Sequence, residues 1–388
     1  MLKIAEALKS NLNFKVKKYD IDNSIFKLHY RITFWMLMCG VAIVCAHEYI
    51  GERIRCLVPD SKLAHVVETF CFFTSTYTVV RHTNRSVINR QIPHPGVGPD
   101  VDDEEIIRHS YYQWVPFFLF FQGLCFYLPH FLWRTKEGGR LKALVEGFDL
   151  IGMLDQDVQK RNLEKIQLQF KDRLFIYRGW TGFLITCEFL NLVNLIFQIY
   201  LTDVFLGYQF MELGVNVFWD EAGDEYNPLD VVFPKMTKCT FKKYGSSGTI
   251  EYHDTLCVMA LNVINEKTFI VLWYWYIVLF ILTVLMLLWR LISFFCHFST
   301  TFNVLNYSFA THLKLNKTDL ITVIRNLSFS EWMFLRYLAS NMDGRMFRDL
   351  LRNLALSFHC PPVSDETDML LPPRKDDSYI VRKDAKNV

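Results

Sequence analysis

The segment HSYYQWVPFFLFFQGLCFYLPHFLW, residues 109–133, contains 25 consecutive residues without a charged side chain. A helix needs about 20 mostly apolar residues to cross the hydrocarbon core of a bilayer. The segment exceeds that length and is rich in phenylalanine and leucine, whose side chains are favourable in lipid. We therefore predict that residues 109–133 form a membrane-spanning helix.

Three further segments have the length and composition of membrane spans. They are residues 28–47, which contain Arg31, residues 180–202, which are interrupted by Glu188, and residues 268–291, which are uncharged from 268 to 289. Arg31 lies near the end of its segment, from where a long side chain can extend to the membrane surface. The sequence therefore predicts four spans.

A fifth uncharged segment, residues 291–313, carries serine, threonine, asparagine and histidine side chains. This polar load makes insertion into the bilayer unfavourable. We interpret the segment as the end of the fourth span followed by an amphipathic stretch.

The composition of the whole chain conceals these spans. The 388 residues are 51% hydrophobic and 16% aromatic, but the mean hydropathy is only +0.14. Four spans occupy about 80 residues, and the polar remainder lowers the average. Ordinary glycine and proline contents exclude a disordered or collagen-like chain. The 42 basic and 40 acidic residues nearly cancel, so we expect no nucleic-acid partner.

Lysine and arginine are distributed unevenly among the segments that flank the spans. Residues 1–31, 134–179 and 290–388 contain 30 of the 42 basic residues, whereas residues 48–108 and 203–267 contain 12. Because basic segments remain in the cytosol, we predict that both termini and the loop 134–179 are cytosolic. Residues 48–108 and 203–267 then form two extracellular loops.

Two cysteines fall in each predicted extracellular loop, Cys56 and Cys71 in the first and Cys239 and Cys257 in the second. An oxidising exterior favours two disulfides, but four cysteines allow three pairings, and their spacing does not choose among them. A glycosylation sequon at Asn84 also lies in the first loop and is a candidate acceptor.

Motifs for enzymatic chemistry do not accompany the spans. None of the 11 histidines lies three or four residues from another, and no phosphate-binding loop or Gly-x-Ser-x-Gly elbow occurs. We therefore expect no catalytic activity, cofactor or metal. Two alternatives to a channel remain open, a four-span adhesion or scaffold protein and, less favoured, a polytopic membrane enzyme.

The start of the second predicted span resembles a family signature. Tyr111, Tyr112, Gln113, Trp114 and Val115, followed by a proline, are similar to the signature of the innexins, which form invertebrate gap junctions. Short matches extend over residues 2–290, among them 21–23, 28–30, 49–51, 95–98, 131–134, 137–139, 239–241, 243–245, 253–254 and 265–267. Two cysteines in each outer loop also fit innexins better than connexins, which typically carry three.

The resemblance implies a large-pore channel. Eight subunits would form a hemichannel in the plasma membrane, which docks onto a hemichannel of an adjacent cell and passes ions and small molecules passively. The implied partners are membrane lipid, identical or related innexin subunits and the docked hemichannel. The resemblance also implies that Cys56 pairs with Cys257 and Cys71 with Cys239.

The amino-terminal segment, residues 1–27, begins with apolar residues at helical spacing. The resemblance implies that this helix folds into the cytoplasmic mouth of the pore and narrows it. The alternative is a helix that rests on the inner leaflet. If the helix lines the pore, the candidate pore-lining residues are Leu2, Lys3, Glu6 and Lys9 of this helix and Glu48 and Glu52 at the outer end of the first span.

Two residues within the spans are candidates for special roles. Pro116, one turn into the second span, is expected to remove a hydrogen bond and bend the helix. The resemblance links such a bend to gating, and helix packing around a kink is the alternative. Glu188, with Asn191 and Asn194 at helical spacing, indicates either a polar subunit interface or a position in the pore.

Together these features predict an all-α membrane protein, a four-transmembrane-helix subunit with a small disulfide-linked extracellular α/β region and a helical cytoplasmic dome. Residues 134–179 and 292–388 would form the dome, with a flexible tail from about residue 361.

Overall fold

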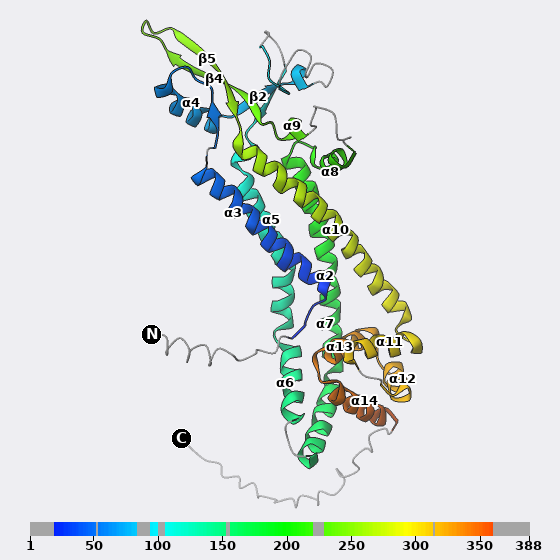
Figure 1. The fold of residues 1–388 in the computed structure, drawn as a ribbon. Helices are drawn as coiled ribbons and strands as arrows, with labels where there is room; N and C mark the ends of the chain where they lie inside the picture. The colour runs from blue at the N-terminus through cyan, green and yellow to red at the C-terminus, as the bar shows by residue number, and fades with distance from the viewer. Residues whose placement is uncertain are drawn as a thin grey trace, which may run out of the picture.

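Long helices run together in the computed structural model, with a small sheet at one end and a cluster of short helices at the other (Figure 1). The structure describes residues 19–51, 53–83, 94–99, 105–152, 156–219, 229–312 and 315–359. Among these residues, four helical segments are long and apolar enough to cross a membrane, Ser24–Glu48, Val115–Glu137, Gly179–Phe205 and Ala260–Cys296.

The first span is not a uniform α-helix. A π-helical segment, η1 (Leu28–Thr33), joins α2 (Ser24–Lys27) to α3 (Phe34–Ile50). The Asn23 side chain caps α2 by accepting a hydrogen bond of 2.6 Å from the backbone N–H of Phe26. The cap sets the start of the first span several residues before the predicted start at residue 28.

The second span, α5 (Val115–Glu137), follows a single 3₁₀ turn, η3 (Tyr111–Gln113). Pro116 lies in the first turn of α5, where a backbone N–H has no acceptor within the helix. The prediction that Pro116 removes a hydrogen bond within the helix is therefore wrong, and its role in gating stays a prediction. α5 ends at Gly138, whose φ of 59° lies in the left-handed region that favours glycine.

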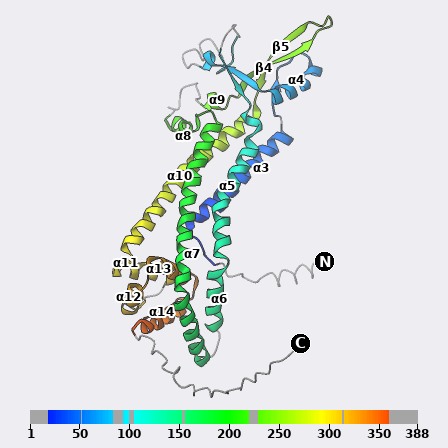
Figure 2. The ribbon, with the colours of Figure 1, turned by 180° about the vertical axis from the view of Figure 1, so that it is seen from behind.

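The third span is part of a much longer helix. α7 (Gln156–Phe205) has 50 residues, which at 1.5 Å per residue is about 75 Å. Its first half therefore continues beyond the span, in the region predicted as a cytosolic loop, beside α6 (Arg140–Gly152). The fourth span, α10 (Ala260–Cys296), has 37 residues and diverges from α5 towards α11 (Figure 2).

The segments between the first two and the last two spans fold together into one antiparallel sheet. Its strand order is β1-β5-β4-β2-β3. We call these strands and the helix α4, which packs on β1 and β4, the sheet domain. Its elements are β1 (Arg55–Cys56), α4 (Ser61–Thr74), β2 (Thr76–Val79), η2 (Val80–Thr83), β3 (Ile106–His109), β4 (Met236–Tyr244) and β5 (Ile250–Val258), while α8 (Phe210–Trp219) and α9 (Leu229–Val232) connect α7 to it.

The short helices at the other end form the helical domain, which consists of α11 (Thr300–Thr311), α12 (Lys317–Arg325), α13 (Phe329–Asn341) and α14 (Gly344–His359). Its core includes the fully buried Trp332, and Phe334 packs edge-on against Trp180 of α7. Trp180 in turn contacts Trp133 near the end of α5. The domain is thus continuous with the ends of the spans.

The predicted fold class is confirmed by this architecture. The protein is mostly helical, with four candidate spans, a small disulfide-linked region that contains the sheet, and a separate helical end. α10 ends at Cys296 and α11 begins at Thr300, so a break between two helices falls within residues 291–313. The end of the fourth span within this segment stays a prediction.

Candidate docking and channel elements

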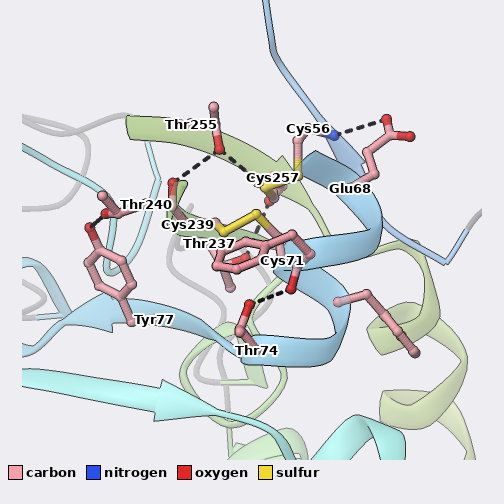
Figure 3. Close-up of a disulfide and its surroundings, with 12 residues drawn as sticks. Cys56, Glu68, Cys71, Thr74, Tyr77, Thr237, Cys239, Thr240, Thr255 and Cys257 are labelled. Atoms are coloured by element: carbon pink, nitrogen blue, oxygen red, sulfur yellow. Dashed lines mark hydrogen bonds between the residues drawn. A yellow bond between two sulfur atoms is a disulfide. The ribbon is translucent and has the colours of Figure 1, made fainter. Parts of the chain in front are cut away.

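Two disulfides cross-link the sheet domain (Figure 3). One joins Cys56 to Cys257 and the other joins Cys71 to Cys239. Cys56 lies directly opposite Cys257 in the β1–β5 ladder, and the second bridge ties α4 to β4. This is the pairing that the resemblance implies. Closing a loop of well over 100 residues restricts the unfolded chain by about 5 kcal/mol in the entropic model, so both bridges hold the two loops together as one unit.

Hydrogen bonds around the bridges connect the same strands (Figure 3). Thr255 Oγ1 donates to the carbonyl oxygen of Cys239 at 3.0 Å, between β5 and β4. The hydroxyls of Tyr77 and Thr240 lie 3.0 Å apart and connect β2 to β4. The sheet domain therefore contains side-chain as well as backbone links between strands from both loops.

The Tyr111–Val115 signature joins the second span to the sheet domain. The Tyr112 hydroxyl donates to the carbonyl oxygen of Phe72 at 3.2 Å, and Gln113 Nε2 donates to the same oxygen at 2.6 Å. The Tyr111 hydroxyl donates to the carbonyl oxygen of Val232 at 3.3 Å. Three of the signature residues thus fix the start of α5 to the end of α4 and to α9.

A buried histidine joins β2 to β3 just before the signature. His109 Nε2 lies 2.8 Å from Thr78 Oγ1, and only 7% of His109 is exposed. Burial lowers the pKa of His109 to about 4, because a charged imidazolium is unfavourable away from water. The histidine is therefore a neutral structural contact near neutral pH.

The β4–β5 hairpin projects away from the helices (Figure 1). Near its tip, Tyr244, Ile250 and Tyr252 are all exposed. The turn between the strands contains Gly248, whose φ is 79°. Exposed apolar groups that gather on one projecting element are typical of a protein contact surface. The hairpin is therefore the candidate docking element of this chain.

A buried ion pair links the third and fourth spans. Arg290 donates to both carboxylate oxygens of Glu188, through Nε at 2.9 Å and a terminal nitrogen at 2.6 Å. Asn23 Nδ2 also donates to Glu188 at 2.7 Å, and the Arg290 terminal nitrogen donates to the Tyr337 hydroxyl at 2.9 Å. Glu188 is fully buried within the subunit, so its prediction as a pore or subunit-interface residue is wrong.

Sequence reasoning treated Arg290 as the boundary of the fourth span and did not find this pair. A signal was available, because Glu188 and Arg290 are single opposite charges in otherwise uncharged spans, and charged groups in lipid seek a partner. The contributions of Asn23 and Tyr337 come from outside the spans and carried no comparable signal.

Most of the predicted pore-lining residues, and the glycosylation candidate, lie outside the described part of the chain, namely Leu2, Lys3, Glu6, Lys9, Glu52 and Asn84. Glu48 is described, is partly buried, and lies near the end of α3, where its carbonyl oxygen accepts a hydrogen bond of 2.7 Å from Arg53 Nε. The pore-lining role of these residues remains a prediction.

Within the described residues, the one group of side chains close enough to hold a metal ion comprises Cys56, Cys71 and Cys257. All three are oxidised to disulfides, and a metal-binding cysteine must be a thiolate. This group is therefore a structural cross-link, not a metal site.

Comparison with known proteins identifies the family. The innexin family model matches residues 22–358. The chain is 43% identical over 385 residues to "Innexin inx7" of Drosophila melanogaster, covering 95% of this chain and 88% of the relative. It is 37% identical over 347 residues to "Innexin inx2" of Schistocerca americana, covering 88% and 94%. It is 36% identical over 364 residues to "Innexin shaking-B" of Drosophila melanogaster, covering 92% and 94%. The chain therefore belongs to the innexin family, whose members are gap-junction channel subunits.

Proposed function

We propose that eight copies of this chain, alone or with related innexins, form a hemichannel that docks onto a hemichannel of an adjacent cell through the sheet domain. The observation that carries the proposal is the joining of two loops, separated along the chain by two spans, into one cross-linked sheet. A surface that meets another membrane must keep its shape without support from its own bilayer. The two disulfides and the continuous ladder of β4 and β5 provide that stiffness.

The orientation follows from charge. Both termini and the helical domain would face the cytosol, because 30 of the 42 basic residues flank that end of the spans. The sheet domain would then be extracellular, where disulfides persist. Surface labelling of an epitope inserted in the β4–β5 turn, compared with one at the carboxyl terminus, tests this orientation.

The pore would be lined by the amino-terminal helix and the outer end of the first span. The family resemblance supports this assignment for Leu2, Lys3, Glu6 and Lys9 of the amino-terminal helix, and for Glu48 and Glu52 at the outer end of the span. Transport through such a pore is passive, so no residue is assigned a catalytic role. Native mass spectrometry of the purified assembly tests the number of subunits, and a ring of other than eight would contradict that part of the proposal.

Docking through the hairpin tip is testable with one substitution. Tyr244→Ser removes an exposed aromatic ring from the tip without disturbing the core. We expect loss of most junctional current between paired cells, while currents through undocked hemichannels in single cells persist. Tyr208→Asn is the matched control, because Tyr208 is equally an exposed tyrosine and lies off the hairpin, at a positive φ that asparagine tolerates.

The alternative function, adhesion by a non-conducting four-span protein, would use the same hairpin. Conductance separates the two. An adhesion protein would join cells in a Tyr244-dependent manner but pass neither current nor small dyes.

A further inference from the structure

Helix α11 has its polar and apolar faces reversed relative to a helix that lies in water. Its buried residues are Asn303, Asn306, Tyr307 and Thr311. Its large exposed residues are instead Leu305 and Phe309, of which 55% and 76% are exposed. A helix at the surface of a water-soluble domain buries its apolar stripe and exposes its polar face. The outer face of α11 is therefore suited to an apolar environment.

The polar face of α11 is bonded to α13, which fixes the side of the helix that points outward. Trp332 Nε1 donates to Asn303 Oδ1 at 2.7 Å, and the Tyr307 hydroxyl donates to the carbonyl oxygen of Trp332 at 3.0 Å. A rotation of α11 that buried Leu305 and Phe309 would break these hydrogen bonds and leave buried polar groups unpaired, which is costly. The exposure of the apolar face is thus built into the packing.

The apolar face of α11 continues the exposed side of the fourth span. Phe309 lines the same cavity as Leu285 and Trp289 of α10, and the ring centroids of Phe302 and Trp289 lie 5.8 Å apart. Trp289 precedes Cys296, the last residue of α10, by seven positions, which is about two helical turns. α11 therefore folds back beside the last turns of the span, next to α13 (Figure 1).

No charged side chain interrupts this surface. Residues 291–313 contain no aspartate, glutamate, lysine or arginine. Exposed apolar side chains extend from the end of α10 into α11, namely Ile292, Phe294, Phe295, Phe298, Leu305 and Phe309. A contact between water-soluble domains usually has a polar rim. An uncharged apolar surface beside an exposed tryptophan at the end of a span is typical of the membrane interface.

We propose that α11 is an interfacial helix, which lies in the plane of the membrane with Leu305 and Phe309 inserted among the acyl chains of one leaflet. The occupant of this surface is lipid and not a second copy of the chain, because the surface is continuous with the outer side of α10. The fourth span has the smallest buried share of the four, 28%, so it presents the most surface to lipid. The proposed orientation of the chain makes this the inner leaflet.

The fold removes the cost that made insertion of residues 291–313 unfavourable. The polar side chains of Ser293, His297, Asn303 and Asn306 are buried within the protein, so they do not meet lipid. The segment does not cross the bilayer, but one side of it lies in the bilayer surface. The helical domain is therefore anchored to the membrane by α11 in addition to the spans.

The test uses the full-length channel in lipid nanodiscs, with photoreactive p-benzoylphenylalanine at one position at a time. Mass spectrometry detects phospholipid adducts, and denaturing electrophoresis detects cross-links between subunits. Position 309 is the test, and position 281 on the exposed side of α10 is the positive control. Position 356 is the matched control, because Leu356 is 58% exposed on α14, which lies farther from α10 than α11 does (Figure 1).

We expect lipid adducts at position 309 as at position 281, and about fivefold or more above those at position 356, because only an inserted side chain touches acyl chains. Equal adducts at positions 309 and 356 would overturn the proposal. Cross-links between subunits at position 309 in place of lipid adducts would identify a second copy as the occupant and would also overturn it.

A second measurement requires no substitution and so does not depend on the folding of a variant. A phospholipid with a diazirine on its acyl chain should label the α11 peptide of the unmodified channel and leave the α14 peptide unlabelled. An unlabelled α11 peptide in a channel whose α10 peptide is labelled would contradict the proposal. Neither measurement depends on docking or conductance.

Discussion

Glu188 and Arg290 show how one side chain on each of two spans can determine how those spans pack. Their charges are buried inside the subunit, where the attraction between them is strong but the loss of hydration is large. The pair is completed by Asn23 at the start of the first span and Tyr337 of the helical domain. Four parts of the chain are therefore connected through one carboxylate and one guanidinium.

Removing one charge of this pair should be far more costly than removing both. We predict that Glu188→Gln lowers the free energy of unfolding by about 3–5 kcal/mol, because it leaves the Arg290 charge buried without its counter-ion. The double variant Glu188→Leu/Arg290→Met should be less destabilised than the single one. Thermal unfolding of the detergent-purified channel measures both.

Glu146→Gln provides the control. Glu146 lies 3.7 Å from Lys142 on α6, and both side chains are about half exposed, so this change should cost about 0.5 kcal/mol or less. A Glu188→Gln protein as stable as Glu146→Gln would show that the buried pair contributes little.

His109 should make the sheet domain sensitive to acid. Its pKa is about 4 in the folded protein and 6.5 when free. Between these values the unfolded chain takes up a proton that the folded protein excludes, so stability falls as the pH falls from 6.5 to 4, by about 1.4 kcal/mol per pH unit. Above pH 6.5 the stability is fully present. Hydrogen exchange of the β2 and β3 amides, corrected for intrinsic rates, should show faster opening at pH 5 than at pH 7.

The variant His109→Gln should lose most of this pH dependence, whereas His65→Gln, at an exposed histidine of α4, should retain it. An unchanged pH dependence in His109→Gln would mean that another group carries the effect.

At the scale of elements, the sheet domain is held by covalent and close-packed contacts. Cys71→Ser should release α4 from β4 and lower the stability of the domain by about 2–5 kcal/mol, as expected for the loss of a native disulfide. Cys296→Ser, at a free cysteine at the end of α10, is the control and should have little effect. Protease sensitivity of the β4–β5 region reports the difference, and equal sensitivity of the two variants would contradict the prediction.

Helix α8 packs against the fourth span through a glycine. A Cβ atom at Gly214 would lie 2.1 Å from ring carbons of Trp273, whose Nε1 donates to the carbonyl oxygen of Met211 at 3.3 Å. Gly214→Ala should therefore lower the free energy of unfolding by about 1–3 kcal/mol through overpacking. Gly182→Ala in α7 meets no atom within 4 Å and should be neutral or slightly stabilising. Thermal unfolding that ranked the two variants in the opposite order would contradict this packing.

The existence of the spans was predictable because length and lack of charge suffice to define them.

The continuity of α7 was not predictable from the sequence. Its first half, residues 156–178, is rich in charged residues and contains no apolar run that would extend the third span. The strand pairing of the sheet was also not predictable. β1 and β5 contribute residues that are 201 positions apart, and no local pattern specifies such a pairing or its register. The prediction placed Pro116 one helical turn too far into the second span. A proline in the interior disrupts a helix, whereas a proline in the first turn is compatible with it.

At the scale of the whole molecule, the chain has a different chemistry at each end. The sheet domain is cross-linked by disulfides and exposes Tyr244, Ile250 and Tyr252 near the tip of its hairpin, whereas the helical domain packs around Trp332 and continues the spans. This division fits a subunit that meets a partner cell on one side and its own cytosol on the other. The long α7 and α10 connect the two ends directly.

The most direct test of the central claim is junctional conductance between two cells that both express this chain, or between one such cell and a cell that expresses a related innexin. We predict junctional current and transfer of small dyes, with Tyr244→Ser abolishing most of both and Tyr208→Asn leaving them intact. The account would be contradicted if the chain reached the contact between the cells and neither current nor dye passed with any innexin partner.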